Sequence, residues 1–97
     1  MNLLGVWIVD ETDAQALTNL GDVLLEFDEG GGLRYTICEH DKRQIINLYY
    51  RVEGSTIVTD QPSAPRVERT QFSFAEDGVL TLAFGGVPYR FVRAPRP

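Results

Sequence analysis

The sequence contains one cluster of side chains that could bind a metal ion or act as nucleophile and base, Cys38-Glu39-His40-Asp41. On an extended chain Cys38 and His40 lie on one face, as two ligands of a single metal ion must. A zinc site needs three or four protein ligands, and the chain has no second cysteine or histidine. We therefore predict no metal ion and no other cofactor.

The same cluster could be drawn as a thiol triad of Cys38, His40 and Asp41. Residues so close in a turn rarely reach triad geometry, and an exposed loop does not exclude water. A solvated loop is the preferred interpretation, and no catalytic residue is predicted.

Aromatic side chains recur at alternate positions along the chain, and they could line a pocket for a small hydrophobic ligand. The same rings could simply fill a small barrel, because an eight-stranded barrel is only just wide enough for its own side chains. Both interpretations remain open for the set Trp7, Phe27, Tyr35, Tyr50, Phe72, Phe74, Phe84, Tyr89 and Phe91.

If a pocket exists, a buried phenol needs a hydrogen-bond partner that an acidic or carbonyl ligand could supply, and an arginine could hold an anion. We accordingly predict that the ligand-binding residues are Trp7, Tyr35, Tyr50, Phe74, Tyr89 and Arg93.

The elements that must position these residues are almost all strands, because the apolar pattern has a period of two nearly everywhere. The predicted strands are Leu3 to Val9, Val23 to Asp28, Leu33 to Cys38, Ile45 to Val52, Ser55 to Thr59, Val67 to Phe74, Val79 to Phe84 and Val87 to Val92. With 97 residues in total, they form one domain spanning residues 1–97.

A single short helix is predicted over Asp13 to Leu20, directly after the first strand. Thr12 would cap it, Gln15 would complete a capping box, and Gly21 would end it. Because two turns are too short to be stable alone, Leu17 and Leu20 are expected to pack against the sheet.

Eight strands joined by short loops predict an all-β, up-and-down antiparallel meander. To avoid exposed edges it must close into a small barrel, or curl strongly and be completed by a second subunit. Residues 1–41 carry nine acidic and one basic side chain, and residues 42–97 five acidic and eight basic. These opposite charges could attract a second copy or neutralise each other within one barrel.

Net charge, the length of apolar runs and the cysteine content indicate which partners and which location the protein can have. The net charge is −5, which disfavours a nucleic-acid partner, and no apolar run is long enough for a membrane span. The first residues lack the basic region of a signal peptide, and one cysteine permits no internal disulfide. We therefore expect a cytoplasmic protein.

Gly5-Val6-Trp7 on the first strand, the short helix after it, the meander and the late arginines of Tyr89-Arg90-Phe91-Val92-Arg93 together resemble the lipocalin-like (calycin) group. The chain looks most like the small bacterial lipocalin-like domains of unknown function. The resemblance implies that Trp7 lies at the closed end of a barrel and that Arg93 or Arg90 packs across its indole. We favour Arg93, because a period of two places it on the side of Tyr89 and Phe91.

Three functional hypotheses follow. The leading one is a non-enzymatic barrel that binds a small hydrophobic or amphipathic ligand. The alternative is a homodimerisation or protein-interaction module with a filled core, whose interface would include Leu24, Ile45, Tyr49 and Val79. The third is a small enzyme that uses the barrel mouth, with His40 as the side chain to test.

Overall fold

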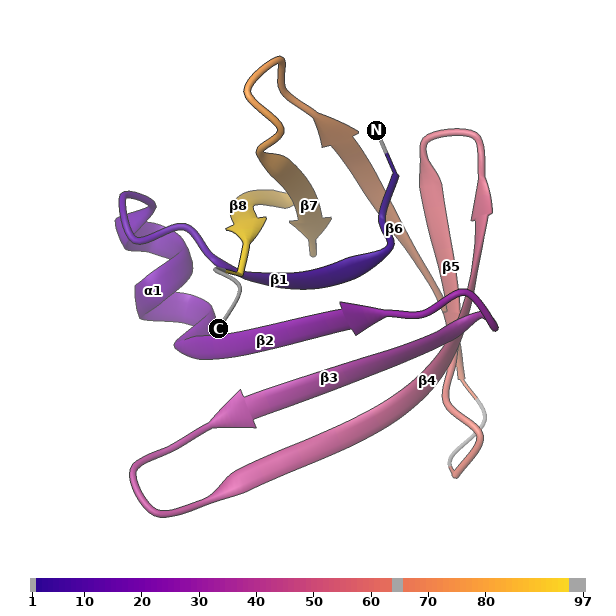
Figure 1. Cartoon of the computed structure of the whole chain (residues 1–97), viewed down its shortest axis with the longest axis horizontal. Coiled ribbons are helices and arrows are strands. Elements are labelled where there is room, and N and C mark those ends of the chain that lie inside the picture. The colour runs from indigo at the N-terminus through magenta and orange to yellow at the C-terminus, as the bar shows by residue number, and fades with distance from the viewer. Residues whose placement is uncertain (1, 64–65, 95–97) are drawn as a thin grey trace.

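Eight antiparallel strands close into a barrel in which each strand pairs with its neighbours in chain order and β8 returns to β1 (Figure 1). The computed structural model describes residues 2–63 and 66–94. The strands are β1 (Gly5–Val9), β2 (Asp22–Phe27), β3 (Gly32–Cys38), β4 (Arg43–Glu53), β5 (Thr56–Asp60), β6 (Val67–Phe74), β7 (Leu80–Phe84) and β8 (Val87–Arg93), and the helix α1 (Ala14–Leu20) follows β1. The predicted fold class is confirmed, and of its two forms the closed barrel is the one found.

This topology gives the barrel two distinct ends. The β1–β2, β3–β4, β5–β6 and β7–β8 connections lie at one end together with α1, and we call it the helix end. The segment before β1 and the other three connections lie at the opposite end, which we call the tryptophan end. No helix within residues 2–63 and 66–94 has the length and apolar character needed to cross a membrane.

The helix begins differently from the prediction. Its N-cap is Asp13, whose carboxylate accepts a hydrogen bond from the Ala16 amide at 3.1 Å. The Thr12 hydroxyl instead donates to Asp10 and accepts from the Arg90 guanidinium at 3.1 Å, so the expected Thr12 cap is wrong. Gly21 ends the helix with φ +74°, as expected, because glycine tolerates positive φ without strain.

The face of α1 that packs against the barrel also differs from the expected one. Ala16 is fully buried, and Leu20 packs against the core, whereas Leu17 is 43 % exposed. The expectation for Leu20 is confirmed and that for Leu17 is wrong, because a helix this close to the strands admits only a small residue at the point of contact.

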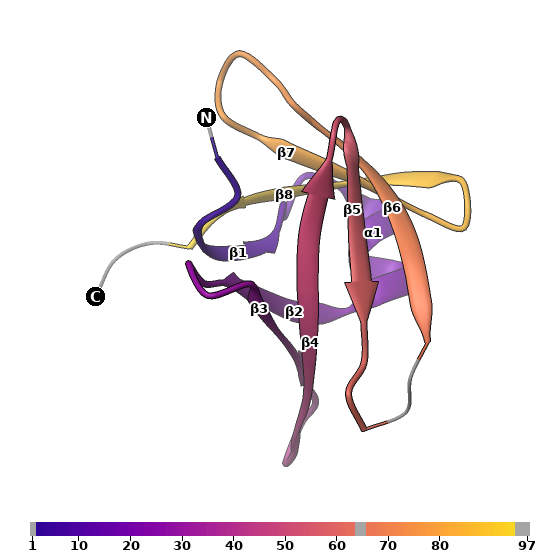
Figure 2. The ribbon, with the colours of Figure 1, turned by 90° about the vertical axis from the view of Figure 1, so that its right-hand side faces the viewer.

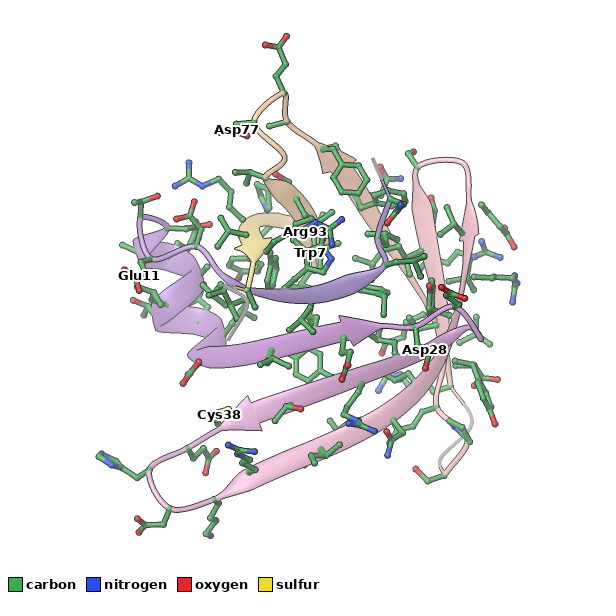
Figure 3. The ribbon with its side chains drawn as sticks, in the orientation of Figure 1. Trp7, Glu11, Asp28, Cys38, Asp77 and Arg93 are labelled. Carbon is green, nitrogen blue, oxygen red and sulfur yellow. The ribbon has the colours of Figure 1, made fainter. Side chains whose placement is uncertain are left out.

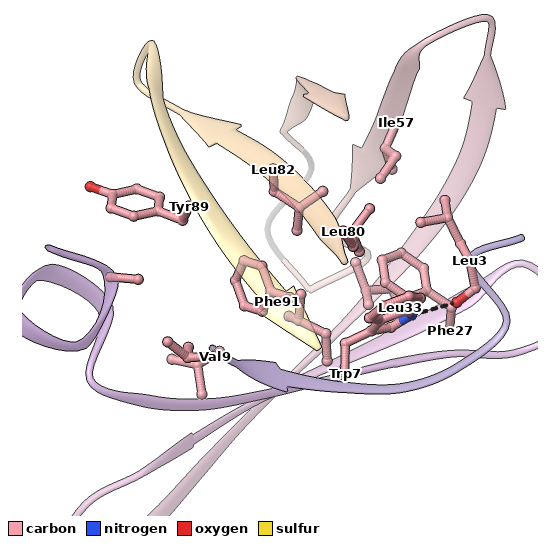
Figure 4. Packing of buried hydrophobic residues seen from close by; sticks show 13 residues of the cluster. Leu3, Trp7, Val9, Phe27, Leu33, Ile57, Leu80, Leu82, Tyr89 and Phe91 are labelled. Atoms are coloured by element: carbon pink, nitrogen blue, oxygen red, sulfur yellow. Dashed lines mark hydrogen bonds between the residues drawn. The ribbon is translucent and has the colours of Figure 1, made fainter. Parts of the chain in front are cut away.

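The hydrophobic core lies to one side of the barrel. Inward side chains of β1, β2, β7 and β8 are almost completely buried, among them Trp7, Leu25, Leu80 and Phe91 (Figure 4). Inward residues of β4 and β6 pack against this cluster but remain only partly buried, as Leu48 and Phe72 illustrate. In the wall formed by β4, β5 and β6, which faces the viewer in Figure 2, the inner faces of β4 and β6 are therefore only partly buried, whereas Ile57 of β5 is 3 % exposed and belongs to the core.

Candidate functional site

An apolar recess of about 130 Å³ lies inside the barrel against this wall, and we call it the inner recess. Antiparallel register explains its lining, since Ile57 pairs with Thr70, and Thr59 with Glu68, so all four share the inward face. The lining residues are Leu25, Phe27, Leu33, Tyr35, Leu48, Ile57, Thr59, Glu68, Thr70, Leu82 and Phe84.

The inner recess opens into a vestibule of about 210 Å³ at the helix end. The two spaces share four lining residues, Tyr35, Leu48, Thr59 and Glu68, and the vestibule adds Ile46, Gln61 and Arg66. Glu68 is paired with Arg66 at 3.0 Å, and both side chains are more than half exposed, so this ion pair contributes little to stability. Its role is to set the charge at the entrance.

Tyr35 connects the recess with the vestibule. Burial in the apolar lining raises the pKa of its phenol, because the phenolate would lose more hydration than the neutral form. Tyr35 therefore stays protonated near neutral pH and can both donate and accept a hydrogen bond.

Two polar contacts hold α1 beside β8 at the helix end. The Asp13 carboxylate accepts hydrogen bonds from the Ala16 amide and, at 2.9 Å, from the Arg90 amide of β8. These bonds lower the pKa of Asp13, the one from Arg90 most. Asn19 donates to the Tyr89 hydroxyl at 3.1 Å, so the predicted ligand group of Tyr89 is already used by the helix.

At the tryptophan end, the Arg93 guanidinium lies over the Trp7 indole, with its central carbon 4.3 Å from the ring centroid (Figure 3). The guanidinium also donates to the carbonyl oxygens of Leu4 and Asn2. The indole N–H donates to Leu3 at 2.9 Å, so Trp7 is buried with its polar group satisfied. The preference for Arg93 over Arg90 is confirmed.

Gly5 explains how Arg93 can approach so closely. A Cβ at this position would lie 2.7 Å from an Arg93 guanidinium nitrogen, and the backbone has φ +114°. Only glycine avoids both the contact and the strained conformation. In this arrangement the Arg93 guanidinium therefore occupies the space over one face of the Trp7 indole.

A second apolar space, of about 300 Å³, opens at the tryptophan end and is lined by Asn2, Leu3, Leu4, Tyr50, Val52, Phe72 and Phe74. It is separated from the inner recess by Phe27 and Tyr50, whose rings meet edge to face at 5.0 Å. The Tyr50 hydroxyl donates to the Asp28 carbonyl at 2.9 Å, which holds this partition in place. Burial, followed by the nearby Asp28 carboxylate, raises the pKa of Tyr50.

The six predicted ligand residues do not surround one pocket. Tyr35 lines the inner recess and the vestibule, whereas Tyr50 and Phe74 line the second apolar space at the tryptophan end. Trp7 and Arg93 contact each other at that end, and Tyr89 is buried beside α1.

Three polar residues of the inner recess were missed from the sequence, Thr59, Glu68 and Thr70. A signal was present for two of them, because Glu68 and Thr70 share the alternation of Phe72 and Phe74, which places all four on the inward face. Only aromatic residues and Arg93 were predicted to bind a ligand, so the polar residues at these inward positions were not included.

The Cys38 to Asp41 cluster lies where β3 turns into β4. Glu39 and Lys42 close this turn with two backbone hydrogen bonds, and His40 is exposed. In the part of the chain that the structure describes, no group of three cysteine, histidine or acidic residues is arranged to hold a metal ion.

Comparison with protein-family models, with curated proteins and with solved structures finds no match for this chain. The β-barrel is therefore described from its own strand pairing.

Proposed function

We propose that this chain is a non-enzymatic, lipocalin-like barrel that binds a small apolar or amphipathic molecule in the inner recess, entering through the vestibule. The observation that carries the proposal is the partly buried inner faces of β4 and β6, where inward side chains such as Leu48 stay half-buried around an apolar space. Apolar walls with a few polar groups are typical of ligand sites.

The lipocalin-like assignment is supported by the contact between Arg93 and Trp7, which is the contact that the resemblance implies. It is also supported by the order of the elements, since a short helix follows β1 and a meander follows the helix. The proposed location is the cytoplasm, in keeping with a single cysteine that permits no internal disulfide.

Ligand entry can be tested with toluene, a probe that fits an apolar recess and has no hydrogen-bonding group. Titration followed by amide chemical shifts is expected to move signals of residues around the recess, such as Leu33, Leu48 and Ile57. Thr70→Phe fills the recess and should abolish these shifts. Ser73→Phe adds the same ring to the outer face of β6 and should leave them unchanged.

The proposal is refuted if the toluene shifts persist in Thr70→Phe. It is also refuted if they centre on the second apolar space at the tryptophan end, which Val52 lines. A native-like amide spectrum of each variant in the absence of toluene shows that the barrel is intact and makes the comparison valid.

Self-association is a second candidate, favoured by an apolar row on the outer surface. Register places Ile8, Leu24, Thr36 and Ile45 side by side across β1 to β4, and Ile45 is 52 % exposed. Glu26 and Arg34 flank this row on adjacent strands.

A two-fold axis between β2 and β3 would set Glu26 of each copy against Arg34 of the other, as a symmetric dimer requires. Sedimentation velocity at micromolar concentration should then show a dimer that Ile45→Lys dissociates. Val67→Lys, at an equally exposed apolar residue of β6, should not affect it. A native chain that sediments as a monomer would eliminate this candidate.

A further inference from the structure

The inner recess has a polar side made of three hydroxyl groups. Thr59 and Thr70 project from adjacent strands, and Tyr35 faces them from β3. The side-chain hydrogen bonds found within residues 2–63 and 66–94 include none to these three hydroxyls, and no side-chain polar atom in that part of the chain is both buried and unpaired, so the three hydroxyls are open to water. A ligand that displaces water here must replace the hydrogen bonds lost by these groups, because an unsatisfied buried hydroxyl is costly.

The size of the recess limits the part of the ligand that can enter. A dry cavity of roughly 150 Å³ accommodates benzene, and the inner recess has about 130 Å³. Phe27 and Tyr50 close it toward the tryptophan end. The recess is somewhat smaller than that cavity, so a single six-membered ring fills it and extends toward the vestibule, whereas an extended alkyl chain has no path past Phe27 and Tyr50.

Charge at the entrance disfavours anions. Glu68 projects inward beside Thr59 and lines both the recess and the vestibule. Its partner Arg66 lines the vestibule but not the recess, so the carboxylate of Glu68 is the charged group that lies against the recess itself. The chain as a whole carries a net charge of −5, which adds to the repulsion.

We infer that the ligand of the inner recess is a single-ring compound that carries a neutral or cationic hydrogen-bonding group, such as a phenol or a ring-bearing amine, and that carboxylates and long-chain lipids are excluded. The inference rests on the proposed binding function and names the class of ligand. Tyr35, Thr59 and Thr70 bind the polar group, and Glu68 selects against negative charge.

The experiment compares toluene, phenol, benzylamine, benzoate and decanoate as probes, with dissociation constants from amide chemical shifts. We expect phenol to bind about tenfold more tightly than toluene, the factor that corresponds to one hydrogen bond. Benzoate should bind about tenfold more weakly than phenol, and benzylamine more tightly than benzoate. Decanoate should produce no shifts around the recess.

Two variants test the assigned roles. Tyr35→Phe should bring phenol and toluene closer in affinity. Glu68→Gln should strengthen benzoate binding severalfold without changing that of phenol. Glu76→Gln, which removes an exposed carboxylate from the turn at the opposite end, is the matched control and should leave all five affinities unchanged.

The experiment distinguishes failure of the proposed function from failure of the assigned ligand class. If none of the rings binds in the recess, the proposed function is wrong, and this inference falls with it. If toluene binds but benzoate binds as tightly as phenol, or Glu68→Gln leaves benzoate unaffected, the recess is a ligand site and the assigned ligand class is wrong. Recess shifts with decanoate refute the size limit.

Discussion

Replacing Gly5 of β1 by alanine should destabilise the barrel more than the same change at a turn glycine with positive φ and open space around it, such as Gly78. The new Cβ would lie 2.7 Å from the Arg93 guanidinium, in a backbone with φ +114°. The backbone strain alone costs about 1 to 3 kcal/mol. Moving the guanidinium off the Trp7 indole loses a further contribution of roughly 0.5 to 1 kcal/mol, because Arg93 is exposed. We expect a total loss of roughly 1.5 to 4 kcal/mol.

Urea denaturation followed by the fluorescence of Trp7, the single tryptophan, measures this loss directly. Gly78→Ala is the matched control, because Gly78 has φ +87° and open space where its Cβ would be. It carries the backbone strain without the steric contact. The difference between the two variants therefore isolates the part that depends on Arg93.

A double-mutant cycle makes the test specific. In an Arg93→Ala background the contact that opposes a Cβ at position 5 is gone, so Gly5→Ala should cost about 1 kcal/mol less than in the native background. Equal costs in both backgrounds, or a Gly5→Ala variant no less stable than Gly78→Ala, would refute the coupling of Gly5, Trp7 and Arg93.

Three further predictions concern the core, the partition and the helix. Phe91→Ala removes a fully buried ring and should cost about 3 to 5 kcal/mol in urea denaturation, a loss that a native-like midpoint would contradict. Tyr50→Phe removes the hydrogen bond to the Asp28 carbonyl and should cost about 0.5 to 1.5 kcal/mol, with an unchanged stability showing that the partition does not depend on it. The Asp13 pKa is lowered in the folded state, chiefly by the Arg90 amide, so its contribution to stability is present above the ordinary aspartate pKa and is lost as the pH falls through the lower folded value. Asp13→Ala should therefore reduce the denaturation midpoint at pH 7 and have a progressively smaller effect as the pH falls below the ordinary aspartate pKa, and an equal reduction at every pH would be inconsistent with this role.

Alternating side chains determine which residues face inward, and this information is local. A strand has a period of two wherever it folds, so the inward positions of Trp7, Leu25, Phe72 and Phe91 could be predicted from residue types alone. The contact between Trp7 and Arg93 was expected from the resemblance to the lipocalin-like group, and in the closed barrel the last strand lies beside the first and brings the two residues together.

The sequence alone could not show which of two neighbouring polar residues caps the helix. Thr12 and Asp13 are both good caps, and the choice depends on a distant group, since the Asp13 carboxylate also binds the Arg90 amide of β8. The helix surface that is buried likewise depends on how closely β8 approaches, which selected Ala16 over Leu17.

The sequence by itself determined the strands, their order and the apolar character of the interior, because these depend on nearest neighbours and on hydrophobic alternation. Only the tertiary structure decided that the rings pack to one side, that Tyr50 and Phe27 divide the interior, and that Glu68 faces the recess with Tyr35. The relative stagger of the strands around a closed barrel sets which inward residues share a level, and that stagger is a property of the whole sheet.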